Sequence, residues 1–205
     1  MDGIQVPPAH YDWPTYNIKG RWISFWHQVD EVVATGAATC LEIGVGPGVI
    51  RHALAQAGVS VTCVDIDPGL DVDRHGDILS LPCSDGEFDV VLCAQVLEHL
   101  PWHDVPRAVA ELRRTCRTHA IVSLPQTGFS AGISVDLSLL GRRSFATRVP
   151  LPRRHSFDGQ HHWQVGARGT GRREVREVLC RGFEIEREYT VPEFTYHRFY
   201  VLRAV

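Results

Sequence analysis

The chain has 205 residues, of which 44% are hydrophobic and 22% are charged, and its formal net charge is −3. A chain of this length buries a full core without splitting, so we expect a single domain over residues 1–205. No run of about 18 apolar residues could span a bilayer, and the N-terminus lacks a basic segment followed by an apolar one. We therefore expect no membrane segment and no secretory leader, and we expect a cytoplasmic protein.

The positive charge of the chain is concentrated in one segment. Ten arginines lie between Arg142 and Arg181, where the acidic residues are Asp158, Glu174 and Glu177, so this segment carries +7 and the remainder −10. Such a field steers an anionic ligand toward one face, although an arginine-rich surface that is only solvated fits the pattern equally well.

The six cysteines lie at positions 40, 63, 83, 93, 116 and 180. They form no Cys-x-x-Cys pair, and Cys40, Cys63 and Cys93 lie within apolar, strand-like runs. This pattern predicts small core residues and neither disulfides nor metal ligands.

An aromatic arm followed by a helix is expected over residues 1–36. Tyr11, Trp13 and Tyr16 belong to the arm, which must pack on the rest of the chain. From Gly20 to Thr35 apolar residues recur at spacings of three and four. That spacing is typical of an amphipathic helix.

Strands and helices alternate over residues 37–125. Apolar runs predict buried strands at residues 38–45, 59–67, 88–97 and 119–125, and helical spacing predicts helices at residues 47–57 and 104–116. The stretch between Asp67 and Asp77 is too short for a crossover helix, its loops and another strand, so we expect one helix to be shortened or missing. The alternation indicates an α/β fold whose parallel sheet is covered by helices on both faces.

The last part of the chain divides into two regions. Residues 126–170 are polar, rich in glycine and arginine and without a firm pattern, so we expect a lid or substrate-binding excursion there. Residues 171–205 predict a helix from about Arg172 to Arg181, followed by an antiparallel hairpin formed by residues 183–191 and 196–205.

Three glycines, Gly44, Gly46 and Gly48, separate the first predicted strand from its helix. A strand, a Gly-x-Gly-x-Gly turn and a helix expose backbone N–H groups to a ligand and let it approach closely. About twenty residues further on, Asp65 ends the second strand, where its carboxylate suits the hydroxyl groups of a ribose. The pattern predicts a nucleotide-like cofactor.

Glu42 discriminates between two such cofactors. It lies two residues before Gly44, where a carboxylate would repel a pyrophosphate but attract the ammonium and sulfonium groups of S-adenosylmethionine. A dinucleotide site would instead show Gly-x-Gly-x-x-Gly. Charge and spacing therefore favour S-adenosylmethionine over NAD.

With these motifs the chain resembles the class I S-adenosylmethionine-dependent methyltransferases from about Cys40 to Val205. The matching pieces are LEIGVGPG, VTCVDID, GDILSLPCSDGEFDVVLCAQVLEHL and the closing strand pair, in the family's order. The chain also resembles an uncharacterised bacterial subgroup that has a shortened second helix. The resemblance implies a Rossmann-like, mostly parallel sheet of seven strands with an antiparallel last strand.

The resemblance also implies which residues would bind the cofactor. They fall into four groups: Glu42, Gly44, Gly46 and Gly48 around the methionine part, Asp65 and Ile66 at the ribose, Asp77 and the Ile78 backbone at the adenine edge, and Ala94 and Gln95 near the methionine end. In the absence of a cofactor, Glu42 would serve as a helix cap, and Asp65 and Asp77 as turn residues.

Histidines are the candidates for catalysis. Methyl transfer needs an acceptor atom held in line with the methyl group, and a general base when that atom belongs to a hydroxyl or a protonated amine. Histidine suits this role near neutral pH. We expect His99, after the fourth predicted strand, or His162, in the excursion, to act as the base; His155, His161 and His197 are further histidines in these regions.

The motif QVLEHL raises the question of a metal. Some quinone-type O-methyltransferases and small-RNA terminal 2′-O-methyltransferases show Glu-x-x-Glu-His there, which binds a divalent cation that activates the hydroxyl. Gln95 replaces the first glutamate in this chain, and an amide is a poorer ligand for a hard cation. We therefore predict no metal, while noting that Glu98, His99 and a histidine of the excursion would suffice for a reduced site; a salt-linked helix start is the other role for Glu98 and His99.

The acceptor is the least constrained part of the prediction. The arginine-rich segment favours O-methylation of a small, anionic or glycan-type acceptor. Metal-assisted 2′-O-methylation of RNA is an alternative, although the acidic remainder of the chain makes nucleic acid an unlikely partner. There are two further alternative functions: an NAD-dependent oxidoreductase, and a protein that binds S-adenosylmethionine without catalysis.

Overall fold

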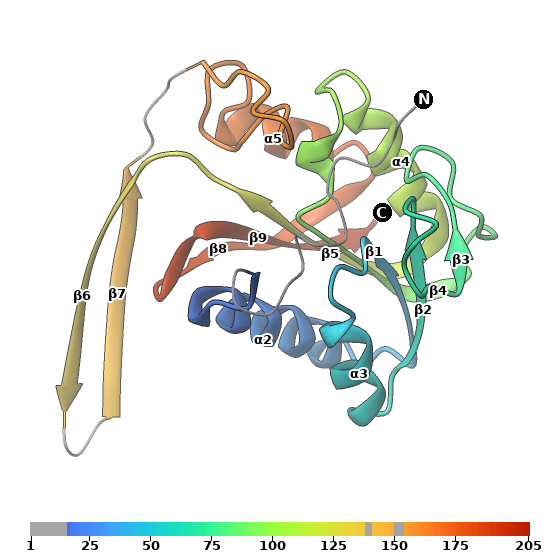
Figure 1. Cartoon of the computed structure of the whole chain (residues 1–205), viewed down its shortest axis with the longest axis horizontal. Coiled ribbons are helices and arrows are strands. Elements are labelled where there is room, and N and C mark those ends of the chain that lie inside the picture. Colours follow the sequence, from blue (N-terminus) through green and yellow to red (C-terminus); the bar gives the residue numbers. More distant parts are fainter. Residues whose placement is uncertain (1–15, 138–140, 150–153) are drawn as a thin grey trace.

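A seven-stranded sheet forms the centre of the computed structural model, which describes residues 16–137, 141–149 and 154–205 (Figure 1). The strands lie in the order β3-β2-β1-β4-β5-β9-β8. Their bounds are Thr39–Ile43 (β1), Ser60–Asp65 (β2), Arg74–His75 (β3), Phe88–Ala94 (β4), Cys116–Pro125 (β5), Phe183–Val191 (β8) and Phe194–Ala204 (β9). The first five strands run parallel to one another, and β9 runs antiparallel to both of its neighbours. The predicted sheet and its antiparallel last strand are confirmed.

Helices cover both faces of this sheet, as predicted (Figure 1). Helices α2 (Lys19–Ala34) and α3 (Val49–Gln56) lie on one face, and α4 (Val105–Thr115) and α5 (Arg172–Leu179) lie on the other. Each helix turns an apolar stripe inward: Val32 and Leu54 are buried on the first face, and Leu112 and Leu179 on the second. Complete burial of one such side chain contributes about 2 kcal/mol, so these stripes fix the helices against the sheet.

The three central strands end at the same edge of the sheet. β1 pairs in parallel with β2 and with β4, and its residues Cys40 and Leu41 are fully buried. Strands that are buried on both faces need an almost continuous apolar sequence, which is why the apolar runs in the sequence predicted these strands. In open parallel sheets ligands bind beyond the carboxyl ends of the strands, so the loops after β1, β2 and β4 are the place to look for a site.

The chain between β2 and β4 contains no helix. β3 is only two residues long, and turns occupy most of the rest of this segment. The expectation of a missing helix is therefore confirmed. The Gly76 N–H donates a hydrogen bond of 2.9 Å to the carbonyl of Asp65. This bond keeps the start of the next loop beside the end of β2.

Strand β4 is shorter than predicted. It ends at Ala94, because Gln95 adopts a left-handed backbone conformation with φ of 57°. The turn is held by the Gln95 N–H, which donates to the Ser123 carbonyl at 2.9 Å, and by a side-chain bond of 3.2 Å between the same residues. A short 3₁₀ helix, η2 (Leu97–His99), follows and carries the sequence Leu-Glu-His.

A β-hairpin occupies part of the region in which no regular structure was expected. Strands β6 (Phe129–Leu137) and β7 (Gly141–Val149) pair antiparallel in a sheet of their own and extend away from the central sheet (Figure 1). Apolar residues alternate with other residues from Phe129 to Leu137, which is the pattern of a strand. The prediction missed this pattern because the region as a whole is rich in glycine and arginine. Of the predicted aromatic arm, Tyr11 and Trp13 lie outside the described residues.

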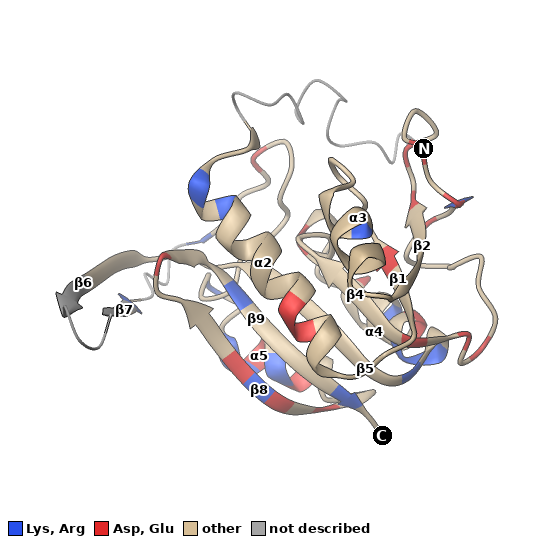
Figure 2. Ribbon diagram, turned by 90° about the horizontal axis from the view of Figure 1, so that it is seen from below, with Lys and Arg blue, Asp and Glu red and all other residues tan. Residues whose placement is uncertain are grey.

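Part of the positive segment is neutralised by the neighbouring strand. Arg172 and Arg176 on α5 bind the carboxylate of Glu188 on β8 at 3.0 Å and 2.6 Å, and Arg198 binds it from β9 at 2.8 Å. Figure 2 shows acidic and basic residues side by side where α5 meets β8. Glu188 lies outside the segment, so the local charge is smaller than the sequence count implies.

Four of the six cysteines are buried, among them Cys40, Cys63 and Cys93, as predicted for core residues, and all six thiols are free. Cys180 is exposed and Cys83 is half-buried.

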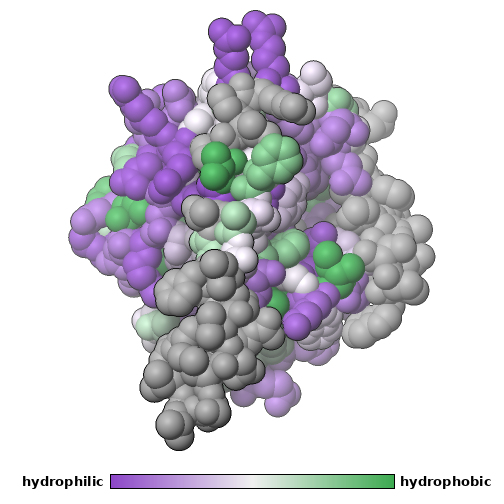
Figure 3. Space-filling view, turned by 90° about the vertical axis from the view of Figure 1, so that its left-hand side faces the viewer, coloured by the Kyte–Doolittle hydropathy of each residue, from purple (hydrophilic) through white to green (hydrophobic). Residues whose placement is uncertain are grey.

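Figure 3 shows the face beside the hairpin, where apolar residues are separated by polar ones. Among the described residues, no helix is both long enough and apolar enough to cross a bilayer.

Candidate active site

A cavity lies at the carboxyl ends of β1, β2 and β4. Nine of the ten predicted cofactor residues line it: Glu42, Gly44, Gly46, Asp65, Ile66, Asp77, Ile78, Ala94 and Gln95. The tenth, Gly48, is the residue before α3 and does not line the cavity. The fold therefore brings together residues that lie as much as 53 positions apart in the sequence.

The glycine turn after β1 needs its glycines. Gly44, Gly46 and Gly48 have φ values of 78°, 52° and 72°, a region that residues with a Cβ atom rarely adopt. A Cβ on Gly44 would also lie 2.5 Å from a methyl group of Val96. The turn keeps the backbone close to the cavity wall, which suits a ligand that approaches the main chain.

Gly44→Ala is expected to lower the free energy of unfolding by about 2 kcal/mol or more, because it combines the left-handed strain with this collision. Gly58→Ala is the matched control: Gly58 has φ of 84°, but no atom within 4 Å of an added Cβ. We expect the control to lose about 1 kcal/mol, and urea denaturation measures both losses. Equal losses in the two variants would show that the contact with Val96 is unimportant.

Asp65 lies at the end of β2 and organises the turn. One carboxylate oxygen accepts the Val45 N–H and the other accepts the Asp67 N–H, each at 3.0 Å. A carboxylate has about four acceptor positions, so these two bonds leave capacity for two hydroxyl groups. Their geometry holds the carboxylate against the glycine turn, where it faces the cavity.

Asp77 and Ile78 form the far wall of the cavity. The Asp77 carboxylate accepts the Leu79 N–H at 2.8 Å, which fixes the turn after β3. Ile78 is only 6% exposed, whereas Ile66, which follows the neighbouring strand β2, is 44% exposed. Of these two lining residues, one is therefore packed into the core and the other is open to solvent.

Glu42 is a buried carboxyl group on β1. Its exposed fraction is 3%, and burial raises its pKa to about 7. The Cys63 thiol donates a hydrogen bond of 3.4 Å to Oε2 of Glu42, and this bond and the charge of Arg51 counteract part of the rise, while Asp65 adds to it. A negative charge here is available to a cationic ligand above about pH 7.

Helix α2 and Tyr16, three residues before it, contribute groups that sequence reasoning did not identify as functional. Arg21 lines the cavity, and its guanidinium carbon lies 3.8 Å from the ring centre of Tyr16. Nε of Arg21 is buried and has no hydrogen-bond partner among the described residues. An arginine in the first turn of an amphipathic helix gives no signal of its own in a single sequence.

His197 on β9 also lines the cavity but is unsuited to accept a proton. It is 2% exposed, and burial lowers its pKa to about 3, with smaller contributions from Arg21 and His161. Its Nδ1 lies 2.7 Å from the Ser24 hydroxyl. His197 is therefore neutral at physiological pH.

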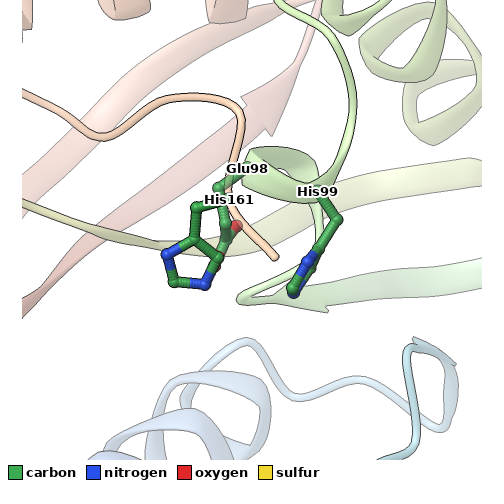
Figure 4. Close-up of side chains that lie close together, drawn as sticks. All are labelled: Glu98, His99 and His161. Atoms are coloured by element: carbon green, nitrogen blue, oxygen red, sulfur yellow. The ribbon is translucent and has the colours of Figure 1, made fainter. Parts of the chain in front are cut away.

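Beside the cavity, Glu98, His99 and His161 form a cluster (Figure 4). Glu98 and His99 come from η2, and His161 comes from the loop after the hairpin. One ligand atom from each residue lies within 4.8 Å of the others. Glu98 is fully buried, burial raises its pKa to about 8, and neither of its carboxyl oxygens has a hydrogen-bond partner among the described residues.

The two predicted catalytic histidines are placed differently. His99 lines the cavity, and its Nδ1 lies 2.9 Å from the Gln160 carbonyl, which orients the ring. His162 does not line the cavity; its ring stacks on Phe157 with centroids 4.4 Å apart. The neighbouring His161 is the residue that the fold brings to His99, with ring centroids 5.1 Å apart.

Residues 41–124 match the family model described as a methyltransferase domain. The methyltransferase assignment therefore stands for this part of the chain, which is less than half of the 205 residues. The predicted Rossmann-like fold is confirmed by solved structures that share it, and two of those proteins contain bound S-adenosylhomocysteine. The match covers β1 to β5, which is the part that lines most of the cavity.

Known proteins resemble the methyltransferase domain to different extents. A ubiquinone biosynthesis O-methyltransferase of Psychrobacter arcticus is 26% identical over an alignment 114 residues long, and the alignment covers 47% of this chain and 44% of that protein. The chain thus matches less than half the length of this curated relative.

Two solved structures share the fold over most of the chain. The 1,6-didemethyltoxoflavin-N1-methyltransferase of Burkholderia thailandensis, with bound S-adenosylhomocysteine, has a TM-score of 0.63 and 15% identity, and covers 98% of this chain and 91% of its own. The magnesium protoporphyrin IX methyltransferase of Synechocystis PCC 6803, also with bound S-adenosylhomocysteine, has a TM-score of 0.57 and 20% identity. The match covers 91% of this chain and 84% of that protein. At these identities the likeness shows the fold alone.

Proposed function

We propose that this protein transfers the methyl group of S-adenosylmethionine to a hydroxyl oxygen of a small molecule. The observation that carries the choice of oxygen is the cluster of Glu98, His99 and His161 beside the cavity. A buried carboxyl group and two imidazoles can bind and deprotonate a hydroxyl, whereas a neutral amine needs no such help. The relative named as an O-methyltransferase supports the same choice.

In this proposal the cavity holds the cofactor in one orientation. Asp65 accepts the ribose hydroxyls, and the loop of Asp77 and Ile78 faces the adenine. The negative charge of Glu42 attracts the ammonium group, and Arg21 binds the carboxylate of the methionine part. Nε of Arg21 is buried and has no hydrogen-bond partner among the described residues, which supports its assignment to an anionic group of a ligand.

The residues of the cluster fit a divalent cation. Both oxygens of Glu98 lack partners among the described residues, and the carbonyl of Gln160 orients His99 as outer partners of metal ligands do. Two imidazoles and one carboxylate are a donor set typical of zinc and similar metals and less so of magnesium. A cation held there would lower the pKa of an acceptor hydroxyl and fix its oxygen.

The chain's own residues then position the acceptor. His99 lies in the cavity wall, so a hydroxyl bound at the cluster meets the cofactor end of the cavity near Ala94 and Gln95. Holding the two reacting atoms at about 3 Å in line supplies much of the rate enhancement of a methyl transfer. His197, which is neutral, also lines the cavity and adds no charge to it.

The acceptor class rests on long-range charge. The arginine-rich segment of residues 142–181 does not line the cavity, but its positive field favours an acceptor that carries a negative charge. The names of the relatives favour a metabolite over a macromolecule.

The test is methyl transfer from radiolabelled S-adenosylmethionine to a panel of phenols and hydroxybenzoates, with the corresponding anilines as matched amines. We expect label on the hydroxyl compounds, a strong preference for the hydroxybenzoates, and loss of activity with a chelator that zinc or manganese restores. Label on the anilines alone would contradict O-methylation, and activity unaffected by chelation would contradict the metal.

His161→Ala is expected to lower turnover about 100-fold, because it removes one member of the cluster. His162→Ala, the variant next to it in sequence, should change turnover less than about threefold, since its ring stacks on Phe157 outside the cavity. Both kcat values are measured with saturating cofactor. A larger loss in His162→Ala than in His161→Ala would restore His162 as the catalytic histidine.

A further inference from the structure

Next to the glycine turn, a cysteine contacts the buried acid of the cofactor site. Glu42 on β1 and Cys63 on β2 are direct partners in the parallel ladder, so their side chains leave the sheet on the same face. Sγ of Cys63 lies 3.4 Å from Oε2 of Glu42. Cys63 is fully buried, and Glu42 is 3% exposed.

The thiol is the donor in this contact. Burial and the charge of Glu42 raise the pKa of Cys63 to about 12, so the sulfur keeps its proton across the physiological range. A carboxylate accepts such a proton, whereas a neutral carboxyl group accepts it less well. The hydrogen bond therefore favours the ionised form of Glu42.

Among the groups that face Glu42, Cys63 makes the largest contribution that favours the ionised form. On β4 the ladder partner of Glu42 is Leu92, which is apolar, and on its own strand Cys40 is fully buried. Arg51 on α3 favours ionisation through its charge and through a backbone hydrogen bond, whereas Asp65 on β2 opposes it. The Arg51 side chain is itself paired with Asp73 at 2.6 Å, which reduces the effect of its charge on Glu42.

We propose that Cys63 is a positioning residue for the cofactor: its thiol holds the Glu42 carboxylate ionised and turned toward the cavity, so that S-adenosylmethionine binds at neutral pH. Cys63 does not line the cavity and would not touch the cofactor. The inference rests on the proposed function, because it assumes that Glu42 attracts the ammonium group of the cofactor. It adds a requirement that the glycine motif alone does not contain.

The proposal predicts a characteristic pH dependence. A carboxyl group with a raised pKa is neutral at low pH, so cofactor affinity should fall as the pH drops through the value for Glu42, about 7. Without the thiol this midpoint moves to higher pH. For a shift of about one unit, Cys63→Ala should bind the cofactor about tenfold more weakly than wild type at pH 6 but only about twofold more weakly at pH 8.

The experiment is calorimetric titration of the full chain with S-adenosylhomocysteine at pH 6, 7 and 8. Cys63→Ser, whose hydroxyl also donates, should restore the wild-type profile. Cys40→Ala is the control for the loss of a buried thiol, since it removes the same volume from the neighbouring strand, and its midpoint should not move. A pH-independent loss in Cys63→Ala, or an unchanged profile, would overturn the proposal.

Failure of the proposed function would look different. If wild-type protein does not bind S-adenosylhomocysteine at any of the three pH values, the cofactor assignment falls and the role of Cys63 falls with it. If wild type binds and its affinity is the same at pH 6 and pH 8, only the inference about Glu42 and Cys63 is overturned.

Discussion

Asp65→Ala should weaken the binding of S-adenosylhomocysteine at least about 100-fold. The substitution removes two charge-assisted hydrogen bonds to the ribose, each of which contributes about 1.5–3 kcal/mol. It also removes the bonds that the carboxylate accepts from Val45 and Asp67, so the glycine turn loses its anchor. The loss is measured by calorimetric titration at pH 8, where Glu42 is ionised.

Two variants separate these contributions. Asp65→Asn keeps one acceptor oxygen for the turn but loses the charge, and should lie between wild type and alanine. Asp67→Ala removes a carboxylate that accepts the Gly69 N–H at 2.8 Å and leaves Asp65 in place. We expect it to bind within about threefold of wild type. Equal binding by wild type and Asp65→Ala would contradict the placement of the ribose.

Glu98→Gln should lower turnover about 1,000-fold while leaving cofactor affinity nearly unchanged. The variant keeps the size and shape of the side chain but can no longer offer a carboxylate to the acceptor hydroxyl or to a cation. The loss should therefore appear in kcat, with a dissociation constant for S-adenosylhomocysteine within about twofold of wild type.

The stability of Glu98→Gln relative to wild type is a second, independent test of the role of Glu98. Because no described residue donates a hydrogen bond to either oxygen of Glu98, the amide should break no internal bond. We expect the free energy of unfolding of the metal-free variant to equal or exceed that of wild type, within about 1 kcal/mol, by urea denaturation. A loss of about 3 kcal/mol or more would show that Glu98 has a structural role.

The cofactor half of the site could be predicted from sequence because its signals are local. Each glycine after β1 is required by the left-handed backbone conformation at its own position, and Asp65 is the last residue of its strand. The register of a parallel sheet then brings these strand ends together, so no long-range contact had to be guessed.

The acceptor half could not be predicted in the same way. His161 lies 62 positions after His99, and nothing in its local pattern identifies it as the partner of His99 and Glu98. His161 and His162 are adjacent and chemically equal in sequence; only the loop conformation decides that the first meets His99 and the second stacks on Phe157. The contact of Cys63 with Glu42 likewise depends on the register of β1 against β2.

The central claim is that the cavity is built for S-adenosylmethionine, and calorimetric titration of the full chain with S-adenosylhomocysteine and NAD in parallel at pH 8 tests it most directly. The account predicts one molecule of S-adenosylhomocysteine per chain with a dissociation constant of about 1–10 μM, and no heat from NAD. Binding of NAD without S-adenosylhomocysteine would contradict the argument from Glu42, and the glycine turn would then be a dinucleotide site.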